Sequence, residues 1–456
     1  MTRWVTGVPL TRRTALVTAL AGAAAVRTTA EFVDGGGSPR HGVLTDEGAA
    51  SVHDLIAAAR TGAVVELSRS WEVELPVVID TPLTLRFVGG SITSTRDITL
   101  IRVIASDVRI EHPVLTGPGG RTAGLGRAVH VVGTVDRPCR GFALHGGVIR
   151  GFSHDGVLLE HTEAFAVTGA DIKDVGYAGI LLFSCADGVV SRNLVDGVHQ
   201  PSPYVNSYGI EAVRATAAGL DVHPRCRRIS VTDNTVRNVR HWEGIDTHGG
   251  IDIAILRNRV EECRVGIAIV PSKDEADAAA TKYAPLSCSV VGNTISRSWR
   301  GPGSGIVVRG AGETVGSGAE RATGSVRGNT VSGYGDGTRD AAVLVYLTRD
   351  LVVAQNDLRA HVRGIGLYHS NSDVVVARNH VRELTTTTGM TMAIHVQAGA
   401  NTGVVVENTA DVGDVGLHCR QTPNTFLSVS NRWRGAAMLP VSAIGSSVLQ
   451  FRDQTS

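Results

Sequence analysis

The chain has 456 residues, of which 43% are hydrophobic and only 4% aromatic, and 54 are glycine. Its net charge of +1 argues against binding nucleic acid or another polyanion by bulk attraction, so local groups would have to meet a charged ligand. Few aromatic residues and many glycines suit a narrow core of stacked aliphatic side chains with tight corners between strands.

The first 30 residues are predicted to be an export signal. Arg12 and Arg13 precede an apolar stretch, Ala15 to Val26, that ends in small residues. The paired arginines resemble a twin-arginine signal. This stretch is too short to span a bilayer comfortably, and no later segment has 18 uninterrupted apolar residues. We expect a mature protein that is soluble, secreted and free of the membrane; an amphipathic N-terminal extension is the alternative.

Residues 31–70 are predicted to form a lead-in and a cap. A Gly-rich stretch precedes a short helix, expected over Ser51–Arg60, and strands at Val64–Leu67 and Pro76–Ile79. A helix here would cover the open end of a solenoid, where unpaired strand edges and bare core would otherwise invite aggregation.

A repeat dominates the rest of the chain. Nine times, an apolar run ends in Asn, one variable residue and then usually an apolar one. The nine are Asn193, Asn234, Asn258, Asn293, Asn329, Asn356, Asn379, Asn408 and Asn431. Their intervals of 41, 24, 35, 36, 27, 23, 29 and 23 residues indicate a unit of 23 or 24 residues that carries insertions. So short a period of β-branched runs is typical of a parallel β-solenoid, in which we expect the Asn side chains to form an internal ladder.

The early part of the chain resembles a known superfamily. The helix expected near residue 51 and the run Leu83–Ile92 resemble the start of proteins of the pectate-lyase-like superfamily, which includes phage tailspike-type depolymerases. The resemblance implies an all-β fold, a single-stranded right-handed parallel β-helix with an N-terminal capping helix. We place the β-helix at residues 71–435 and a C-terminal cap at 436–456. The resemblance also implies a polysaccharide partner and allows a homotrimer.

A second signature, Gly followed by an apolar, a variable and an apolar residue, follows each Asn unit. Side chains alternate across a strand, so the residue after Gly points inward and the next one points to solvent. Aligning the coils in this way places Glu211 beside Asp246, His248 at the next outward position, and Arg309 two coils from His248. We expect Glu211, Asp246 and His248 to share one exposed patch. Stacked acids raise one pKa or call for a cation between them.

The longer intervals locate insertions in the middle of the repeat. They fall at residues 199–207 with 215–225, at 271–285 and at 310–323. Loops from equivalent corners of neighbouring coils project on one side, so these segments are expected to wall a groove.

The segment Glu243–Gly250 is the most specific local signal. It resembles the Tyr-Gly-x-Asp-Pro-His motif of β-helical alginate C5-epimerases. Its glycine, aspartate and histidine match, whereas Glu243 replaces the tyrosine and Thr247 the proline. Tyr208, just ahead of the glycine in the preceding coil, is a candidate to stand near the place of the lost tyrosine.

Three functions are open, and a lyase or C5-epimerase acting on an acidic glycan is favoured. His248 would be its base or acid, Glu211 and Asp246 would hold a cation such as Ca²⁺ or tune the histidine, and Arg309 would meet the substrate carboxylate. In a glycoside hydrolase Glu211 and Asp246 would be acid and base, at a separation nearer that of retaining enzymes, about 5 Å. The third is a non-catalytic glycan-binding or structural rod, in which Asp246 only hydrogen-bonds its own turn.

Other residues are expected to contact the glycan or to fill the scaffold. The candidates for substrate binding are Tyr208, Trp242, Glu243, Lys273, Tyr346 and Tyr368. Cys185 and Cys226 occupy the same place in adjacent coils, which allows either a disulfide or a stack of thiols in the core. His395 and His418 form a second outward pair that we expect at the surface.

Overall fold

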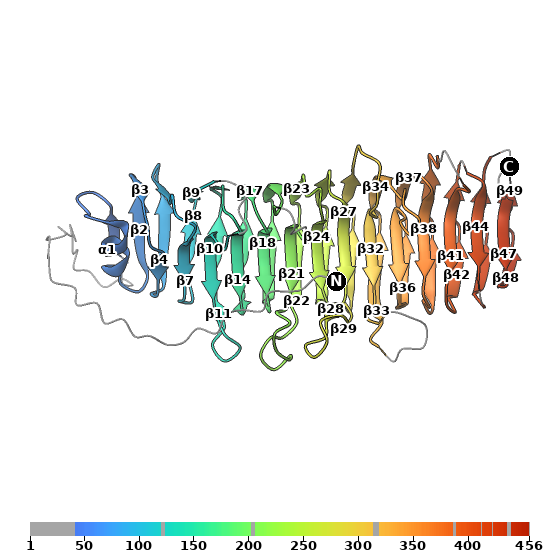
Figure 1. The fold of residues 1–456 in the computed structure, drawn as a ribbon, viewed down its shortest axis with the longest axis horizontal. Coiled ribbons are helices and arrows are strands. Elements are labelled where there is room, and N and C mark those ends of the chain that lie inside the picture. Colours follow the sequence, from blue (N-terminus) through green and yellow to red (C-terminus); the bar gives the residue numbers. More distant parts are fainter. Residues whose placement is uncertain are drawn as a thin grey trace, which may run out of the picture.

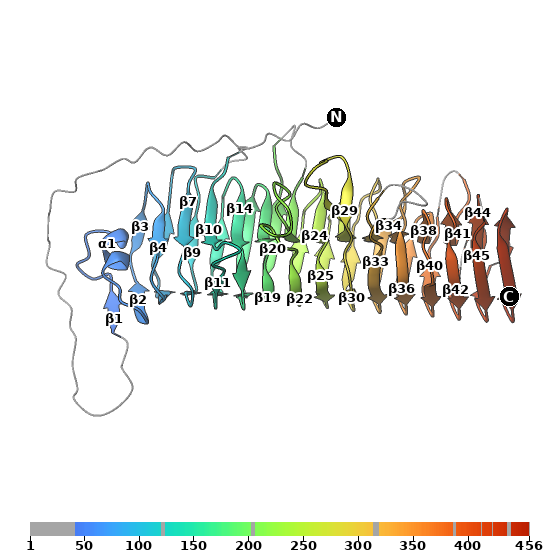
Figure 2. The same ribbon diagram turned by 90° about the horizontal axis from the view of Figure 1, so that it is seen from below.

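The computed structural model describes residues 42–119, 124–201, 206–312, 319–385, 389–411, 413–421, 423–435 and 439–455. These residues form one long rod in which successive coils stack from the N-terminal to the C-terminal end (Figures 1 and 2). The expected export signal lies outside the described residues. No helix in the described part of the chain is long and apolar enough to cross a membrane.

Three parallel sheets run the length of the rod, and each coil passes from sheet C to sheet A and then to sheet B. Sheet C has 14 strands and carries the outward positions predicted above. Its strands are β4 (Val77–Ile79), β7 (Thr99–Val103), β10 (Arg127–Val132), β14 (Asp155–Glu160), β18 (Ala178–Phe183), β21 (Tyr208–Val213), β24 (Glu243–His248), β27 (Val265–Val270), β32 (Ile306–Arg309), β35 (Val343–Tyr346), β38 (Arg363–Tyr368), β41 (Met392–Gln397), β44 (Val415–Arg420) and β47 (Leu439–Ile444).

Sheets A and B complete each coil. Sheet A consists of β1 (Val43–Thr45), β2 (Ala63–Leu67), β5 (Leu83–Phe87), β8 (Arg109–Glu111), β11 (Cys139–Arg140), β12 (Ala143–His145), β15 (Thr162–Glu163), β16 (Ala166–Thr168), β19 (Ala186–Ser191), β22 (Arg227–Thr232), β25 (Ile251–Leu256), β30 (Cys288–Val291), β33 (Ala322–Arg327), β36 (Thr348–Ala354), β39 (Val374–Ala377), β42 (Thr402–Val406), β45 (Thr425–Val429) and β48 (Ser447–Phe451). Sheet B consists of β3 (Ser70–Glu72), β6 (Ser91–Thr93), β9 (Val114–Thr116), β13 (Val148–Arg150), β17 (Asp171–Val175), β20 (Leu194–Val198), β23 (Thr235–Arg237), β26 (Arg259–Glu261), β31 (Thr294–Ser296), β34 (Thr330–Tyr334), β37 (Asp357–Ala360), β40 (His380–Arg382), β43 (Thr409–Ala410), β46 (Arg432–Trp433) and β49 (Gln454–Thr455). A separate antiparallel pair joins β28 (Ser272–Lys273) to β29 (Thr281–Tyr283).

The core is a column of aliphatic side chains that stack from coil to coil. Ile210, Ile245 and Ile267 are register partners on β21, β24 and β27, and all three are fully buried. Each of these isoleucines follows a glycine, and neighbouring atoms come so close to that glycine that a side chain would not fit. A Cβ at Gly244 would lie 2.7 Å from the carbonyl oxygen of Gly266 in the next coil and 2.6 Å from a methyl group of Val260. The Gly-apolar signature therefore marks the place where a strand of sheet C lies close to the next coil and to a side chain from sheet B.

The predicted Asn ladder is confirmed. The side-chain oxygen of Asn234 accepts from the backbone N–H of Asn193 at 3.0 Å and from its amide nitrogen at 2.9 Å. The same pattern repeats to Asn431, whose backbone N–H donates to Asp453 at 2.9 Å. These bonds satisfy buried polar groups at one corner of the coils from Asn193 to Asn431.

A second, shorter ladder was not predicted. The backbone N–H of Asn371 donates to the side-chain oxygen of Asn401 at 2.9 Å, and that of Asn401 donates to Asn424 at 3.2 Å. All three are fully buried. Three members at another corner make a weaker sequence signal than nine.

Both ends of the rod differ from the predicted boundaries. The helix α1 (Val52–Ala57) lies at the N-terminal end (Figure 1) and is shorter than the expected Ser51–Arg60. Ser51 caps it by accepting from the backbone N–H of Asp54 at 3.0 Å. The coils begin with β1 inside the lead-in, and β47, β48 and β49 extend each sheet by one strand. The strands β47, β48 and β49 thus continue the coils within the segment that was expected to form the C-terminal cap.

All six cysteines are buried and free. The backbone N–H of Cys185 donates to the sulfur of Cys226 at 3.3 Å, so these two residues stack in the core as thiols. Of the two alternatives considered for this pair, the structure has the stack.

Candidate functional site

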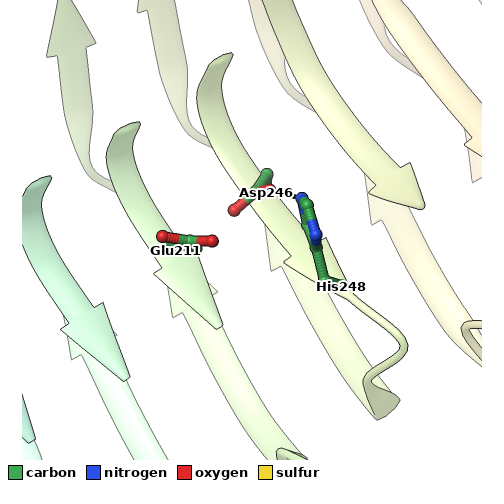
Figure 3. A group of neighbouring side chains, drawn as sticks. All are labelled: Glu211, Asp246 and His248. Atoms are coloured by element: carbon green, nitrogen blue, oxygen red, sulfur yellow. Dashed lines mark ion pairs between the residues drawn. The ribbon is translucent and has the colours of Figure 1, made fainter. Parts of the chain in front are cut away.

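Strands β21 and β24 bring together two carboxyl groups that lie far apart in the sequence. Glu211 and Asp246 are direct register partners on the outer face of sheet C, and His248 lies two residues further along β24 (Figure 3). One side-chain atom from each of these three residues lies within 4.8 Å of the others. The predicted juxtaposition of Glu211, Asp246 and His248, called the trio below, is confirmed.

The predicted exposure of the trio is wrong. Glu211 and Asp246 are each 2% exposed, and only His248 offers an appreciable part of its side chain, 24%, to solvent. An apolar cluster that includes Leu181, Tyr208 and Val213 packs on the same face beside Glu211. Alternation along a strand shows which face a side chain points to, but larger neighbours on adjacent rungs can still bury it.

The charges of the trio are strongly coupled. Nε2 of His248 lies 2.7 Å from Oδ2 of Asp246 and 3.8 Å from Oε2 of Glu243. Burial, reinforced by the charge of Asp246, raises the pKa of Glu211 well above its ordinary value. Burial also raises the pKa of Asp246, against the opposing charge of His248, to about 7. Burial alone would lower the pKa of His248, but the charge of Asp246 outweighs it and raises that pKa.

Several buried polar atoms of this cluster have no hydrogen-bond partner among the described residues. They are Oε2 of Glu211, Oε2 of Glu243, both carboxyl oxygens of Asp246 and Nε2 of His248. The short approach of His248 to Asp246 is therefore an ion-pair distance without hydrogen-bond geometry. Each such group costs about 1–3 kcal/mol when it stays unpaired. Asp246 does not hydrogen-bond its own turn as the structural alternative required, and the carboxyl oxygens of the cluster keep the capacity to accept hydrogen bonds from a ligand.

The comparisons with known proteins concern the fold. No family model and no curated protein matches the chain. Among solved structures, the Agl-KA catalytic domain is 10% identical, with 92% of this chain and 70% of that chain covered and a TM-score of 0.54. The chain has the right-handed parallel β-helix fold.

Two further solved structures are similar at lower scores. A variant of the periplasmic alginate epimerase AlgG is 12% identical over 91% of this chain and 84% of that chain, with a TM-score of 0.44. The catalytic domain of a GH87 alpha-1,3-glucanase in complex with nigerose is 11% identical over 83% of this chain, with a TM-score of 0.44. The β-helix described here spans 66% of the length of that glucanase domain.

The trio could hold a metal ion, and its donor atoms indicate which kind. Ca²⁺ takes six to eight oxygen ligands, whereas the trio offers two carboxylates and an imidazole. A mixed set of nitrogen and oxygen donors suits an ion such as Zn²⁺ or Mn²⁺ better. The donor set therefore does not support the expected Ca²⁺, although it fits a divalent transition ion.

Three of the predicted substrate-binding residues lie beside the trio. Tyr208 and Glu243 are register partners at the start of β21 and β24. The ring of Tyr208 meets that of His248 edge-on, with centroids 6.2 Å apart. Trp242 packs against the same apolar cluster, and the guanidinium of Arg264 lies 5.4 Å from its ring. These side chains border the site at the start of β21 and β24.

The other predicted site residues do not reach the trio. Arg309 lies on β32, two strands beyond β24, and its guanidinium donates to the carbonyl of Gly312 at 3.4 Å. Lys273 belongs to the antiparallel pair, and its carbonyl accepts from Arg214 at 3.4 Å. Tyr346 and Tyr368 pack against each other further along sheet C, with ring centroids 5.6 Å apart. Aligning the coils placed Arg309, Tyr346 and Tyr368 on the correct face but did not show that they lie away from the acids, and Lys273, predicted in a loop, had no place in that alignment.

The predicted insertions leave the β-helix at two different corners. The described residues 214–226, 271–287 and 310–312 with 319–321 follow β21, β27 and β32, on one side of the rod (Figure 1). Residues 199–201 and 206–207 instead follow β20 and lead into β21, at the opposite end of the strands that carry the site. The expected grouping of 199–207 with 215–225 is wrong, because the extra residues of that long coil are split between two corners.

Two buried arginines join the three projecting loops into one wall, and sequence analysis missed both. Arg214 donates to the carbonyls of His223 at 3.1 Å and Lys273 at 3.4 Å. Arg225 donates to the carbonyl of Gly249 at 2.5 Å and forms an ion pair with Glu320 at 3.1 Å. The wall is thereby attached to the corner that directly follows His248. An arginine in an insertion is an ordinary surface residue in sequence, so no pattern marked these two.

Proposed function

We propose that this β-helix is a glycoside hydrolase in which Glu211 and Asp246 are the acid and base. The observation that carries the proposal is the pair of facing, buried carboxyl groups with raised pKa values and with oxygens that have no hydrogen-bond partner among the described residues. Such pairs characterise glycoside hydrolysis, in which one carboxyl protonates the leaving oxygen and the other acts as base or nucleophile.

The environments of the two acids assign their roles. Glu211 has a pKa raised well above its ordinary value by burial and by Asp246, so we assign it as the proton donor. Asp246 lies beside His248, whose charge opposes the effect of burial and leaves the pKa of Asp246 at about 7. We therefore assign Asp246, the carboxyl that pairs with a cation, as base or nucleophile. His248 acts as its positioning partner.

The local charge favours a neutral sugar at the point of cleavage. The charges with the largest effect on the pKa values of the trio come from its own members and from nearby carboxylates, with His248 the sole cation among them. Arg309, expected to neutralise a substrate carboxylate, is two strands away. An acidic sugar placed over Glu211 and Asp246 would meet like charge, whereas a neutral sugar would not.

A lyase or C5-epimerase remains a second candidate because the trio fits a divalent ion. Two carboxylates and an imidazole within 4.8 Å of one another could hold such an ion. When bound, the ion would supply the positive charge that offsets a uronic acid carboxylate. Proton abstraction from the sugar would then be left to a protein side chain, of which Tyr208 and Glu243 are the nearest.

The type of product tests the proposal. We expect incubation of a panel of neutral polysaccharides with the purified protein to release new reducing ends without ultraviolet absorbance. Glu211→Gln and Asp246→Asn should each lower turnover by about 100-fold to 10,000-fold while the protein stays folded. Asp252→Asn is the matched control, because Asp252 is an exposed carboxylate in the same coil on sheet A. Unsaturated or epimerised products from acidic glycans would favour the second candidate, and no turnover on any glycan would favour a binding rod.

A further inference from the structure

A strip of aromatic side chains runs along sheet C on the C-terminal side of the trio. We call it the aromatic strip, and it consists of Tyr346, Tyr368, His369, His395 and His418. The ring of Tyr346 stacks on that of His369, with centroids 5.2 Å apart and planes 12° apart. His395 lies 5.4 Å from Tyr368 and 5.3 Å from His418. The strip therefore continues over four successive coils, from β35 to β44.

A glycine allows the strip to form. A Cβ at Gly366 would lie 3.1 Å from Cζ of Tyr368, so the absence of a side chain there leaves room for the tyrosine ring across the strand. The Tyr368 hydroxyl consequently reaches Nδ1 of His395 at 3.1 Å. His395 and His418, expected at the surface, are 3% and 6% exposed because this packing covers them. Tyr346 and His369 are half-buried and form the solvent side of the strip.

The two buried histidines have unused ring nitrogens. Nε2 of His395 and Nδ1 of His418 lack hydrogen-bond partners among the described residues. Burial, together with Arg363 and His418, lowers the pKa of His395 to about 3, and burial with Arg420 lowers that of His418. Both rings are neutral at ordinary pH, and each keeps one ring nitrogen, Nε2 of His395 and Nδ1 of His418, for a further hydrogen bond.

Arginines flank the strip along its length. Arg309 and Arg339 lie near Tyr346 and His369, and Arg363 and Arg420 lie near His395. Within the described ranges, none of these arginines forms an ion pair; Arg309 and Arg363 donate to backbone carbonyls. Asp340 also lies near Tyr346 and Tyr368, so arginines outnumber carboxylates around the strip, whereas carboxylates outnumber cations around the trio.

We propose that the aromatic strip with its arginines binds an anionic segment of a glycan, a uronic or sulfated sugar, while the trio acts on a neutral sugar of the same chain. Guanidinium groups match the planar or tetrahedral oxygens of carboxylate and sulfate, and aromatic faces cover the apolar faces of sugar rings. This inference deepens the proposed function and rests on it for the neutral cleavage site. Tyr346 lies three strands from His248, which at about 4.8 Å per strand is roughly 14 Å. One oligosaccharide can span that distance.

Binding of oligosaccharides of equal length tests the strip independently of turnover. The probes are an oligogalacturonate, a sulfated carrageenan oligosaccharide and a neutral cello-oligosaccharide, titrated calorimetrically into the full chain at low ionic strength. We expect one or both anionic probes to bind more tightly than the neutral one, with an affinity that falls as salt is added. Whichever anionic probe binds identifies carboxylate or sulfate as the group recognised.

Variants locate the binding. The double substitution Arg309→Gln and Arg420→Gln should weaken the anionic probe about tenfold or more, corresponding to about 1.4 kcal/mol. Tyr346→Ala should weaken it as well, whereas Tyr346→Phe should keep most of the affinity. Arg349→Gln is the matched control, since Arg349 is an exposed arginine in the same coil but on sheet A.

Two results would overturn the inference. One is equal affinity for neutral and anionic probes, and the other is a loss of affinity in Arg349→Gln as large as in the double variant. Asp252→Asn should bind the anionic probe as the unaltered chain does, because Asp252 lies on sheet A, away from both the strip and the trio. If the protein hydrolyses no glycan yet the anionic probe binds at the strip, the proposed function fails while the strip stands.

Discussion

Arg225 donates from Nε to the carbonyl oxygen of Gly249 at 2.5 Å, one residue beyond His248. The same guanidinium also donates to the carbonyl of Ala284 and pairs with Glu320, each from a different projecting loop. Because Arg225 is largely buried, these contacts are shielded from solvent, and the corner that follows His248 takes its position partly from the loop wall. Insertions that are separate in the sequence are therefore connected to the site through the contacts of Arg225.

Replacing Arg225 by Gln should reduce turnover through His248. We expect kcat to fall about tenfold, because the histidine would lose its fixed place beside Asp246. The acidic limb of the pH–rate profile should move as well, since the pKa of Asp246 depends on the charge of His248. A purely structural role would lower the unfolding temperature without moving the profile. Arg228→Gln is the control, because Arg228 makes an exposed ion pair with Asp187.

The stability of the fold should decrease as pH rises through neutrality. Folding raises the pKa values of Glu211, Asp246 and His248, so the folded chain holds these protons more tightly than the unfolded chain. The resulting stabilisation is complete below the unfolded pKa values and is lost as pH rises through the folded ones. For Asp246 the window runs from 3.8 to about 7.

Thermal unfolding measured from pH 5 to pH 9 checks this sign. Relative to Asp246→Asn, the unaltered chain should lose melting temperature as pH rises, because the variant lacks one of these groups. Groups whose pKa is lowered by folding, such as His395 and His418, act in the opposite sense but are common to both proteins. Asp252→Asn should follow the unaltered chain. A melting-temperature difference between the unaltered chain and Asp246→Asn that instead grows with pH in favour of the unaltered chain would contradict the raised pKa values.

The fold and the place of the site were predictable, whereas the environment of the site was not. The Asn repeat and the Gly-apolar signature fix the coil period, and that period alone pairs Glu211 with Asp246 across 35 positions. Burial of the acids depends on bulky neighbours such as Tyr208 and on which corner each insertion leaves. The same holds for Arg309. The period predicted the face of the sheet on which Arg309 lies and its distance in coils from His248, but it could not predict that the guanidinium donates to the carbonyl of Gly312.

The Asn ladder should carry a measurable part of the stability. In Asn293→Ala the backbone and side-chain N–H groups of Asn258 would lose an acceptor, and the carbonyl of Ile255 would lose a donor. Each buried group left unpaired costs about 1–3 kcal/mol, so denaturant unfolding should show a loss of several kcal/mol. Asn206→Ala removes a half-buried amide outside the ladder and should change stability by about 0.5 kcal/mol or less. Similar losses in both variants would mean that the ladder adds nothing beyond ordinary hydrogen bonds.

Added Zn²⁺ should distinguish the two candidate functions. An ion held by Glu211, Asp246 and His248 would displace the proton that a hydrolase needs on Glu211, so Zn²⁺ should inhibit hydrolysis. It should also raise the melting temperature, because it binds the folded chain alone. His248→Ala should abolish both effects, whereas His53→Ala, an exchange in the helix α1 far from sheet C's centre, should abolish neither. Activation by Zn²⁺, with unsaturated or epimerised product from an acidic glycan, would instead assign the trio to a lyase or epimerase.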